Sequence, residues 1–179
     1  MISTSTVRAG RRVRIVVVVV AVLTVLLLSH RLGRAVPTNN YRPDLPADAL
    51  VTGCFPLPGG ADLDDLAYQV RQDGDVAVAS GIRRQLRGQY DLVDRDEAER
   101  RIVAAFEKVG FREQRRADPD GPVVLRRSDA TEVSVTVVEI PGTDAGTIVR
   151  GDFVLDLPVS AAGSAAVCQD PKSTKRWPS

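Results

Sequence analysis

The residue types that carry most protein catalysis are scarce in this chain of 179 residues. Its single histidine, His30, lies just after a long apolar run at residues 15–28. The chain beyond His30 therefore has no imidazole for nucleophilic catalysis or metal binding. Catalysis there would depend on carboxylates, lysine or cysteine. We expect no enzymatic activity, no cofactor and no metal site.

Three acidic clusters remain as candidates for acid–base chemistry, at residues 62–65, 94–97 and 118–120. The first two open predicted helices, where the helix dipole favours acids. The third belongs to a Pro-Asp-Gly turn and matches a calcium loop poorly, because Pro122 and Val123 occupy its fifth and sixth positions. We interpret all three clusters as structural. The alternative is a carboxylate-dependent hydrolase with two acids facing each other across a groove.

Two Arg-Arg pairs, Arg115-Arg116 and Arg126-Arg127, flank one predicted turn. In a hairpin centred on Asp120 these four side chains could form a basic patch that grips phosphate or carboxylate groups of an anionic envelope polymer. Scattered surface charge is normal, and we expect a solvated strand face here. The anion-binding patch is the alternative.

The chain has two cysteines, Cys54 and Cys168, near the two ends of the predicted folded domain. We predict a disulfide between them, because an even cysteine count in an exported domain favours pairing. Such a bond would stabilise the domain by about 4–5 kcal/mol in the chain-entropy model. Residues 51–54, Val-Thr-Gly-Cys, imitate a lipobox. We do not expect lipidation, because the apolar run of a lipoprotein signal adjoins its lipobox.

The apolar run at residues 15–28, IVVVVVAVLTVLLL, determines on which side of a membrane these groups work. Arginines precede and follow it, and the preceding excess keeps residues 1–12 cytoplasmic by the positive-inside rule. We predict a transmembrane signal-anchor helix at 13–32, although the run is short for a hydrocarbon core of about 30 Å. The alternative is a secretory signal cleaved before Val36.

The expected exported part is mildly acidic, with 18 basic against 23 acidic residues beyond residue 36. This balance argues against nucleic-acid binding, which needs a net basic face. Nearly all basic residues are arginine, which is typical of proteins from GC-rich bacteria. We expect a proline-containing stalk at 33–50, one extracytoplasmic α+β domain at 51–170 and a disordered tail at 171–179.

Hydrophobic periodicity predicts the elements of that domain. Asp62 would cap a short helix that ends before Gly74, and Asp94 with Glu97 would form a capping box for the helix 95–109. This arrangement indicates an antiparallel β-meander covered on one face by one main helix, an α+β fold. The predicted strands cover 82–93, 111–116, 123–127, 131–140 and 147–157.

Together these features predict a single-pass protein of the bacterial plasma membrane, with its N-terminus inside and its C-terminal domain outside. We expect a non-catalytic binding or scaffolding component of the cell envelope. Its expected partners are the lipid bilayer, through the N-terminal helix, and an envelope protein or anionic polymer.

Overall fold

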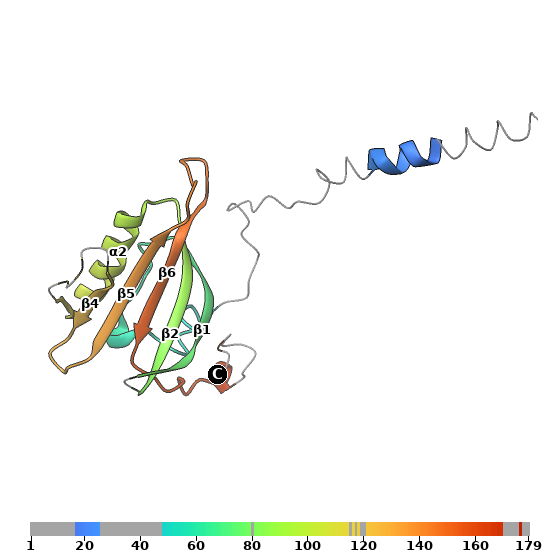
Figure 1. Ribbon diagram of the computed structural model, residues 1–179. Coiled ribbons are helices and arrows are strands. Elements are labelled where there is room, and N and C mark those ends of the chain that lie inside the picture. Colours follow the sequence, from blue (N-terminus) through green and yellow to red (C-terminus); the bar gives the residue numbers. More distant parts are fainter. Residues whose placement is uncertain are drawn as a thin grey trace, which may run out of the picture. The chain divides into compact units, whose positions relative to one another are not determined.

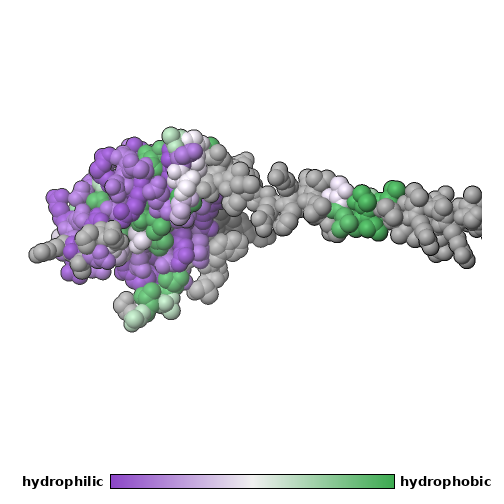
Figure 2. Space-filling view, turned by 45° about the horizontal axis from the view of Figure 1, so that its top comes forward, coloured by the Kyte–Doolittle hydropathy of each residue, from purple (hydrophilic) through white to green (hydrophobic). Residues whose placement is uncertain are grey.

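The computed structural model describes residues 17–25, 48–79, 81–114, 116, 118, 121–169 and 176. The chain divides into two units, Met1–Thr38 and Asn39–Ser179. In the first unit residues 17–25 are helical, and all of their side chains are exposed. The hydroxyl of Thr24 donates to the carbonyl of Val20 at 2.8 Å, which satisfies the one polar side chain of this stretch. Figure 2 shows the stretch as an almost entirely hydrophobic surface.

No helix formed by the described residues is long and apolar enough to cross a membrane. The predicted anchor at 13–32 continues on both sides of the helical stretch 17–25, into residues outside the described part of the chain. The anchor therefore stays a prediction. The predicted N-terminal segment 1–12 and most of the predicted stalk 33–50 also lie outside the described residues.

The second unit is built on one six-stranded antiparallel sheet with the helix α2 (Arg95–Glu107) along it (Figure 1). Two short 3-10 helices, η1 (Pro58–Gly60) and η2 (Ala166–Gln169), lie outside the sheet. The predicted α+β class and antiparallel sheet are confirmed. The strands are β1 (Tyr68–Val78), β2 (Gly81–Asp91), β3 (Arg112–Glu113), β4 (Val123–Arg126), β5 (Glu132–Glu139) and β6 (Val149–Leu157).

The strand order in the sheet is β1-β2-β6-β5-β4-β3. The last four strands form the predicted meander, while β1 and β2 form a hairpin that pairs with the far side of β6. Leu86 of β2 lies opposite Leu155 of β6, and Val135 of β5 lies opposite the same Leu155. The sheet therefore has β1 at one edge and β3 at the other.

The helix predicted after Asp62 is wrong, because residues 61–67 form a loop and turn and β1 begins at Tyr68. Leu63 and Leu66 are buried as loop residues, with 3% and 4% of their surfaces exposed, which accounts for their helix-like spacing. A bulge between Val70 and Gln72 also breaks the period-two pattern by which a strand is recognised. The apolar spacing therefore predicts correctly that these leucines are buried, but it predicts a helix where the structure has a loop and a strand.

The helix α2 forms where the sequence predicts it, although it ends at Glu107 rather than at residue 109. Asp94 caps its N-terminus, since the carboxylate accepts a hydrogen bond from the backbone N–H of Glu97 at 2.8 Å. Its buried face packs on one side of the sheet and closes the core. This face comprises Ala98, Ile102, Ala105 and Phe106.

Two glycines make room for aromatic rings at the centre of this core. Gly88 of β2 lies opposite Phe153 of β6, and Gly151 of β6 lies opposite Tyr90 of β2. A Cβ on Gly88 would come within 2.3 Å of the Phe153 ring, and a Cβ on Gly151 within 2.3 Å of the Tyr90 hydroxyl. Each glycine therefore accepts the ring of its neighbour strand, as aromatic residues over sheet glycines do. Gly151 is the middle residue of an Arg-Gly-Asp tripeptide in β6, of which Arg150 is half-buried and Asp152 is exposed.

Candidate functional site

The predicted disulfide joins Cys54 to Cys168 and ties the start of the folded unit to the segment after β6. The two Cα atoms are 5.1 Å apart across a sequence separation of 114 residues. Both cysteines are buried in a small cluster with Ala49 and Phe55, separate from the main core. The sequence prediction is confirmed, and the bond lies beside the most unusual polar group of the fold.

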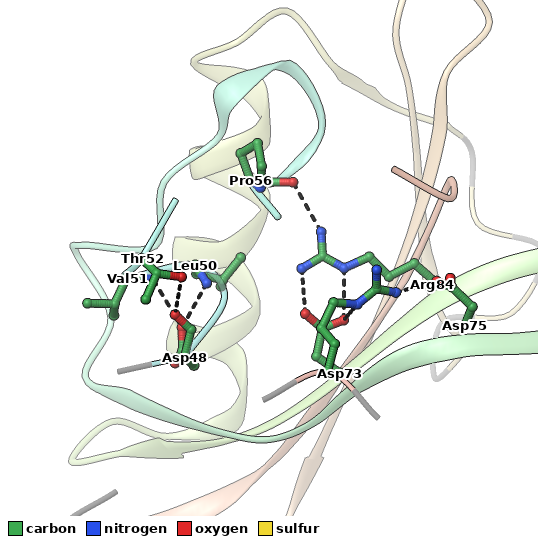
Figure 3. A network of polar contacts seen from close by, with 9 residues as sticks. Asp48, Leu50, Val51, Thr52, Pro56, Asp73, Asp75 and Arg84 are labelled. Atoms are coloured by element: carbon green, nitrogen blue, oxygen red, sulfur yellow. Dashed lines mark hydrogen bonds and ion pairs between the residues drawn. The ribbon is translucent and has the colours of Figure 1, made fainter. Parts of the chain in front are cut away.

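That group is a buried ion pair between Arg84 of β2 and Asp73 of β1. Their side chains are only 1% and 2% exposed. Arg84 donates from Nε and Nη2 to the two carboxylate oxygens of Asp73, at 2.8 and 2.7 Å, and from Nη1 to the carbonyl of Pro56 at 3.1 Å (Figure 3). The guanidinium thus links the β1–β2 hairpin to the loop that follows Cys54. Such a bidentate pair is among the strongest hydrogen-bonded arrangements in proteins.

A second arginine, Arg176, approaches the same carboxylate from the C-terminal segment. Its Nε is 3.3 Å from Oδ1 of Asp73, and its Nη2 pairs with Asp75. The guanidinium carbon of Arg176 also lies 4.2 Å from the ring centroid of Phe55, a cation–π contact that Arg84 makes at 5.7 Å. Two arginines therefore lie over one aromatic ring, and two aspartates pair with them, so the charges balance.

The segment 48–52 forms a local turn before the disulfide, and its Ala49 packs with the cysteines and Phe55. The carboxylate of Asp48 accepts hydrogen bonds from the backbone N–H groups of Leu50 and Val51, at 2.9 and 3.0 Å, and its carbonyl accepts one from the Thr52 hydroxyl (Figure 3). This turn leads directly into Cys54 and Phe55. The disulfide and the ion pairs thus hold the N-terminal and C-terminal segments of the folded unit against the same end of the β1–β2 hairpin.

Sequence reasoning missed this network, although a signal for it exists. Arg84 occupies an even position between Ile82 and Leu86, in phase with the apolar residues of the predicted strand 82–93. A charged residue in that phase predicts a buried, paired side chain. The predicted tail 171–179 contains a residue of the network, Arg176, and the other residues of that tail lie outside the described part of the chain.

The structure describes three of the four arginines of the predicted patch, and these three do not converge on one site. The fourth, Arg115, lies outside the described residues. Arg116 pairs with Glu99 of α2, and this hydrogen bond is the main cause of its raised pKa. Arg126 pairs with Glu132 on the face of the sheet away from α2, because its strand neighbour Leu125 is buried on the helix side. These guanidinium groups therefore point apart.

The last member of the patch, Arg127, packs over the Phe111 ring at 5.3 Å and pairs with Asp129. The hydrogen bond with Asp129 raises the pKa of Arg127 and holds the pKa of the Asp129 carboxyl well below its usual range. Each described arginine of the patch thus has its own acidic partner, which weakens its capacity to hold an external anion.

The acidic cluster 62–65 borders a surface cleft of about 410 Å³, and Asp62 and Asp64 are among its lining residues. A hydrogen bond with Asp62 raises the pKa of Asp64, and both carboxylates are exposed. The two buried aspartates of the described residues, Asp73 and Asp91, do not line this cleft. The carboxylates that line the cleft, Asp62 and Asp64, are thus exposed, whereas the general acid of a lysozyme-type glycosidase lies in an apolar pocket that raises its pKa.

No group of three or more potential metal-ligating side chains occurs within the described ranges. Of the turn compared with a calcium loop, Asp118 is described and Asp120 lies outside these ranges.

Comparison of the chain with protein-family models, curated proteins and solved structures found no match. The buried pair of Arg84 and Asp73, together with Arg176 and Asp75, is the candidate functional site of the described residues.

Proposed function

We propose that this chain is a membrane-anchored extracytoplasmic domain that acts by binding or scaffolding in the bacterial cell envelope. The observation that carries the proposal is the disulfide between Cys54 and Cys168. Disulfides persist in oxidising compartments outside the cytoplasm and are rare inside it. The apolar run at 15–28 supplies a route of export, and the arginines before it favour a cytoplasmic N-terminus.

A non-catalytic role follows from the chemistry available outside the membrane. His30 lies within the predicted anchor, so the exported domain would contain no histidine. The arginines and aspartates beside the disulfide neutralise one another, an arrangement that orders chain segments rather than activating a nucleophile or a water molecule. A protein partner in the envelope suits this arrangement better than an anionic polymer, because the arginines at the β3–β4 edge are already paired with acids.

Cell fractionation with intact-mass analysis, performed without reductant, tests this proposal. We expect full-length chain in the membrane fraction, with both cysteines blocked to thiol reagents and the domain accessible to protease added outside. A soluble form that starts near Val36 would make this a secreted domain instead. A cytoplasmic chain with two reactive thiols would overturn the proposal.

A pair of matched variants separates anchoring from general effects of added charge. Val20→Asp places a carboxylate in the middle of the apolar run, where it costs about 3 kcal/mol of insertion free energy. Val138→Asp adds the same charge at a position on β5 that is 56% exposed. We expect Val20→Asp to deplete the membrane fraction and Val138→Asp to leave it unchanged.

A further inference from the structure

The outer edge of β1 is an edge of the sheet that one residue of the C-terminal segment contacts. β1 is the last strand on its side of the sheet, and no other named strand of the described residues pairs with its outer edge. Among the described residues, Arg176 alone is bridged to this edge, through a parallel β-bridge to Asp73. Extended peptides bind exposed sheet edges in this way, with backbone pairing for affinity and side-chain sites for specificity.

The side-chain site beside this bridge is built to hold a guanidinium. Asp75 and Asp73 contact Arg176 from β1, and the Phe55 ring lies 4.2 Å from its guanidinium carbon. The Arg176 side chain is only 10% exposed, although it belongs to the last few residues of the chain. An anchor with two carboxylates at its edge and an aromatic ring at its face matches the planar, multiply donating arginine side chain rather than lysine.

Charge balance explains why the site needs a second cation besides Arg84. Arg84 already neutralises Asp73 through its bidentate pair. Asp75, which lies opposite Arg84 in the β1–β2 register, makes its ion pair with Arg176 instead. Without Arg176 the domain would present one uncompensated carboxylate beside an aromatic ring and the outer edge of β1, which together form a binding surface for a cationic segment.

We propose that the outer edge of β1, with Asp73, Asp75 and Phe55, is a docking site for an extended, arginine-bearing peptide segment of a partner protein. In the structure the chain's own Arg176 occupies this site. The inference rests on the proposed binding role and deepens it by naming the surface and the chemistry of the partner. Its test uses purified protein, so its failure is distinguishable from a failure of the proposed location.

The chain's own Arg176 competes with a partner segment for this site. Cys168, fixed by the disulfide, precedes Arg176 by only eight residues, which keeps Arg176 near the site. Short tethers give effective concentrations in the millimolar range. A partner segment must therefore outcompete Arg176, and removal of the Arg176 side chain strengthens binding of a segment supplied in trans.

Fluorescence anisotropy with a fluorescein-labelled peptide of residues 171–179 tests the site on the full-length chain in detergent micelles. We expect the Arg176→Ala chain to bind this peptide at least about tenfold more tightly than the wild-type chain, because the internal competitor is gone. A peptide in which Arg176 is replaced by lysine should bind about tenfold more weakly, since it keeps the charge but loses the planar stacking and the fork of donors.

Two carboxylate variants, each in the Arg176→Ala chain, provide the matched control. Asp75→Asn removes the proposed acceptor, and Asp156→Asn removes a carboxylate of similar exposure, 30% against 34%, on the opposite face of the sheet. We expect Asp75→Asn to abolish measurable peptide binding and Asp156→Asn to preserve it. Equal losses from the two variants would reduce the effect to general electrostatics and overturn the proposal.

Further outcomes decide the identity of the occupant. If Arg176→Ala and wild-type chains bind the peptide equally, the site is not an exchangeable docking site. If wild-type chains form dimers that Arg176→Ala abolishes in sedimentation experiments, the occupant is a second copy, and the proposed partner is wrong. Should Arg176→Ala unfold, an Arg176→Lys chain serves in its place, with circular dichroism to verify the fold and a smaller gain in peptide affinity expected.

Discussion

Each end of the sheet, the β1–β2 edge and the β3–β4 edge, carries an ion pair between an arginine and a carboxylate, but one pair is buried and the other is exposed. At the β1–β2 end, Arg84 and Asp73 form a pair with side chains that are 1% and 2% exposed. At the β3–β4 end, Arg126 and Glu132 form a pair with side chains that are 54% and 42% exposed. The difference teaches that burial, rather than the presence of an ion pair, determines how much the fold depends on an arginine.

The disulfide should show the largest effect, because it fixes the chain segments that surround the buried pair. Replacing both Cys54 and Cys168 with alanine removes a cross-link that spans 114 residues. We expect a loss of about 4–5 kcal/mol in the free energy of unfolding, since the unfolded chain regains the corresponding conformational entropy. Urea unfolding followed by circular dichroism measures this loss.

Reduction of the wild-type chain is the control for that variant. Reduction breaks the cross-link but keeps both side chains in the cluster with Phe55. A similar loss in both experiments assigns the effect to the cross-link. A loss confined to the double-alanine variant would instead assign it to packing, contrary to our expectation.

Arg84→Ala tests the buried side of the comparison. The substitution leaves the Asp73 carboxylate buried without its bidentate partner, and we expect a loss of about 3–5 kcal/mol in the free energy of unfolding. Arg83→Ala is the matched control, because Arg83 is the neighbouring residue and pairs with Asp156 at 2.6 Å on the more exposed face. We expect Arg83→Ala to cost about 1 kcal/mol or less. Equal losses would contradict the assignment of the cost to burial.

The two ends of the sheet also differ in how well the sequence predicts them. The helix α2 and the strands β4 to β6 follow from local patterns, because each has a regular apolar period and clear turn residues at its ends. The Asp94 cap was likewise predicted and is confirmed. Local chemistry is sufficient where an element buries only apolar side chains on one face.

The β1–β2 end could not be predicted in the same way. The bulge after Val70 shifts the phase of β1, and the core face then carries Asp73 rather than an apolar residue. The partner of that aspartate is on another strand, and Arg176 is more than 100 positions away in the sequence. At this end the sequence predicts the disulfide, since two cysteines allow a single pairing, and a strand at 82–93 that corresponds to β2.

The smallest expected effect tests the exposed side of the comparison. Arg126→Ala removes a pair that lies in water, where the Coulomb attraction is screened and both side chains regain rotamer freedom. We expect a change of about 0.5 kcal/mol or less in the free energy of unfolding, and a smaller one when the urea titration is repeated at high salt. Arg84→Ala should keep its full cost at that salt concentration, because the dense packing around Asp73 excludes counterions. If the two variants responded alike to salt, burial could not be the property that separates the two ends of the sheet.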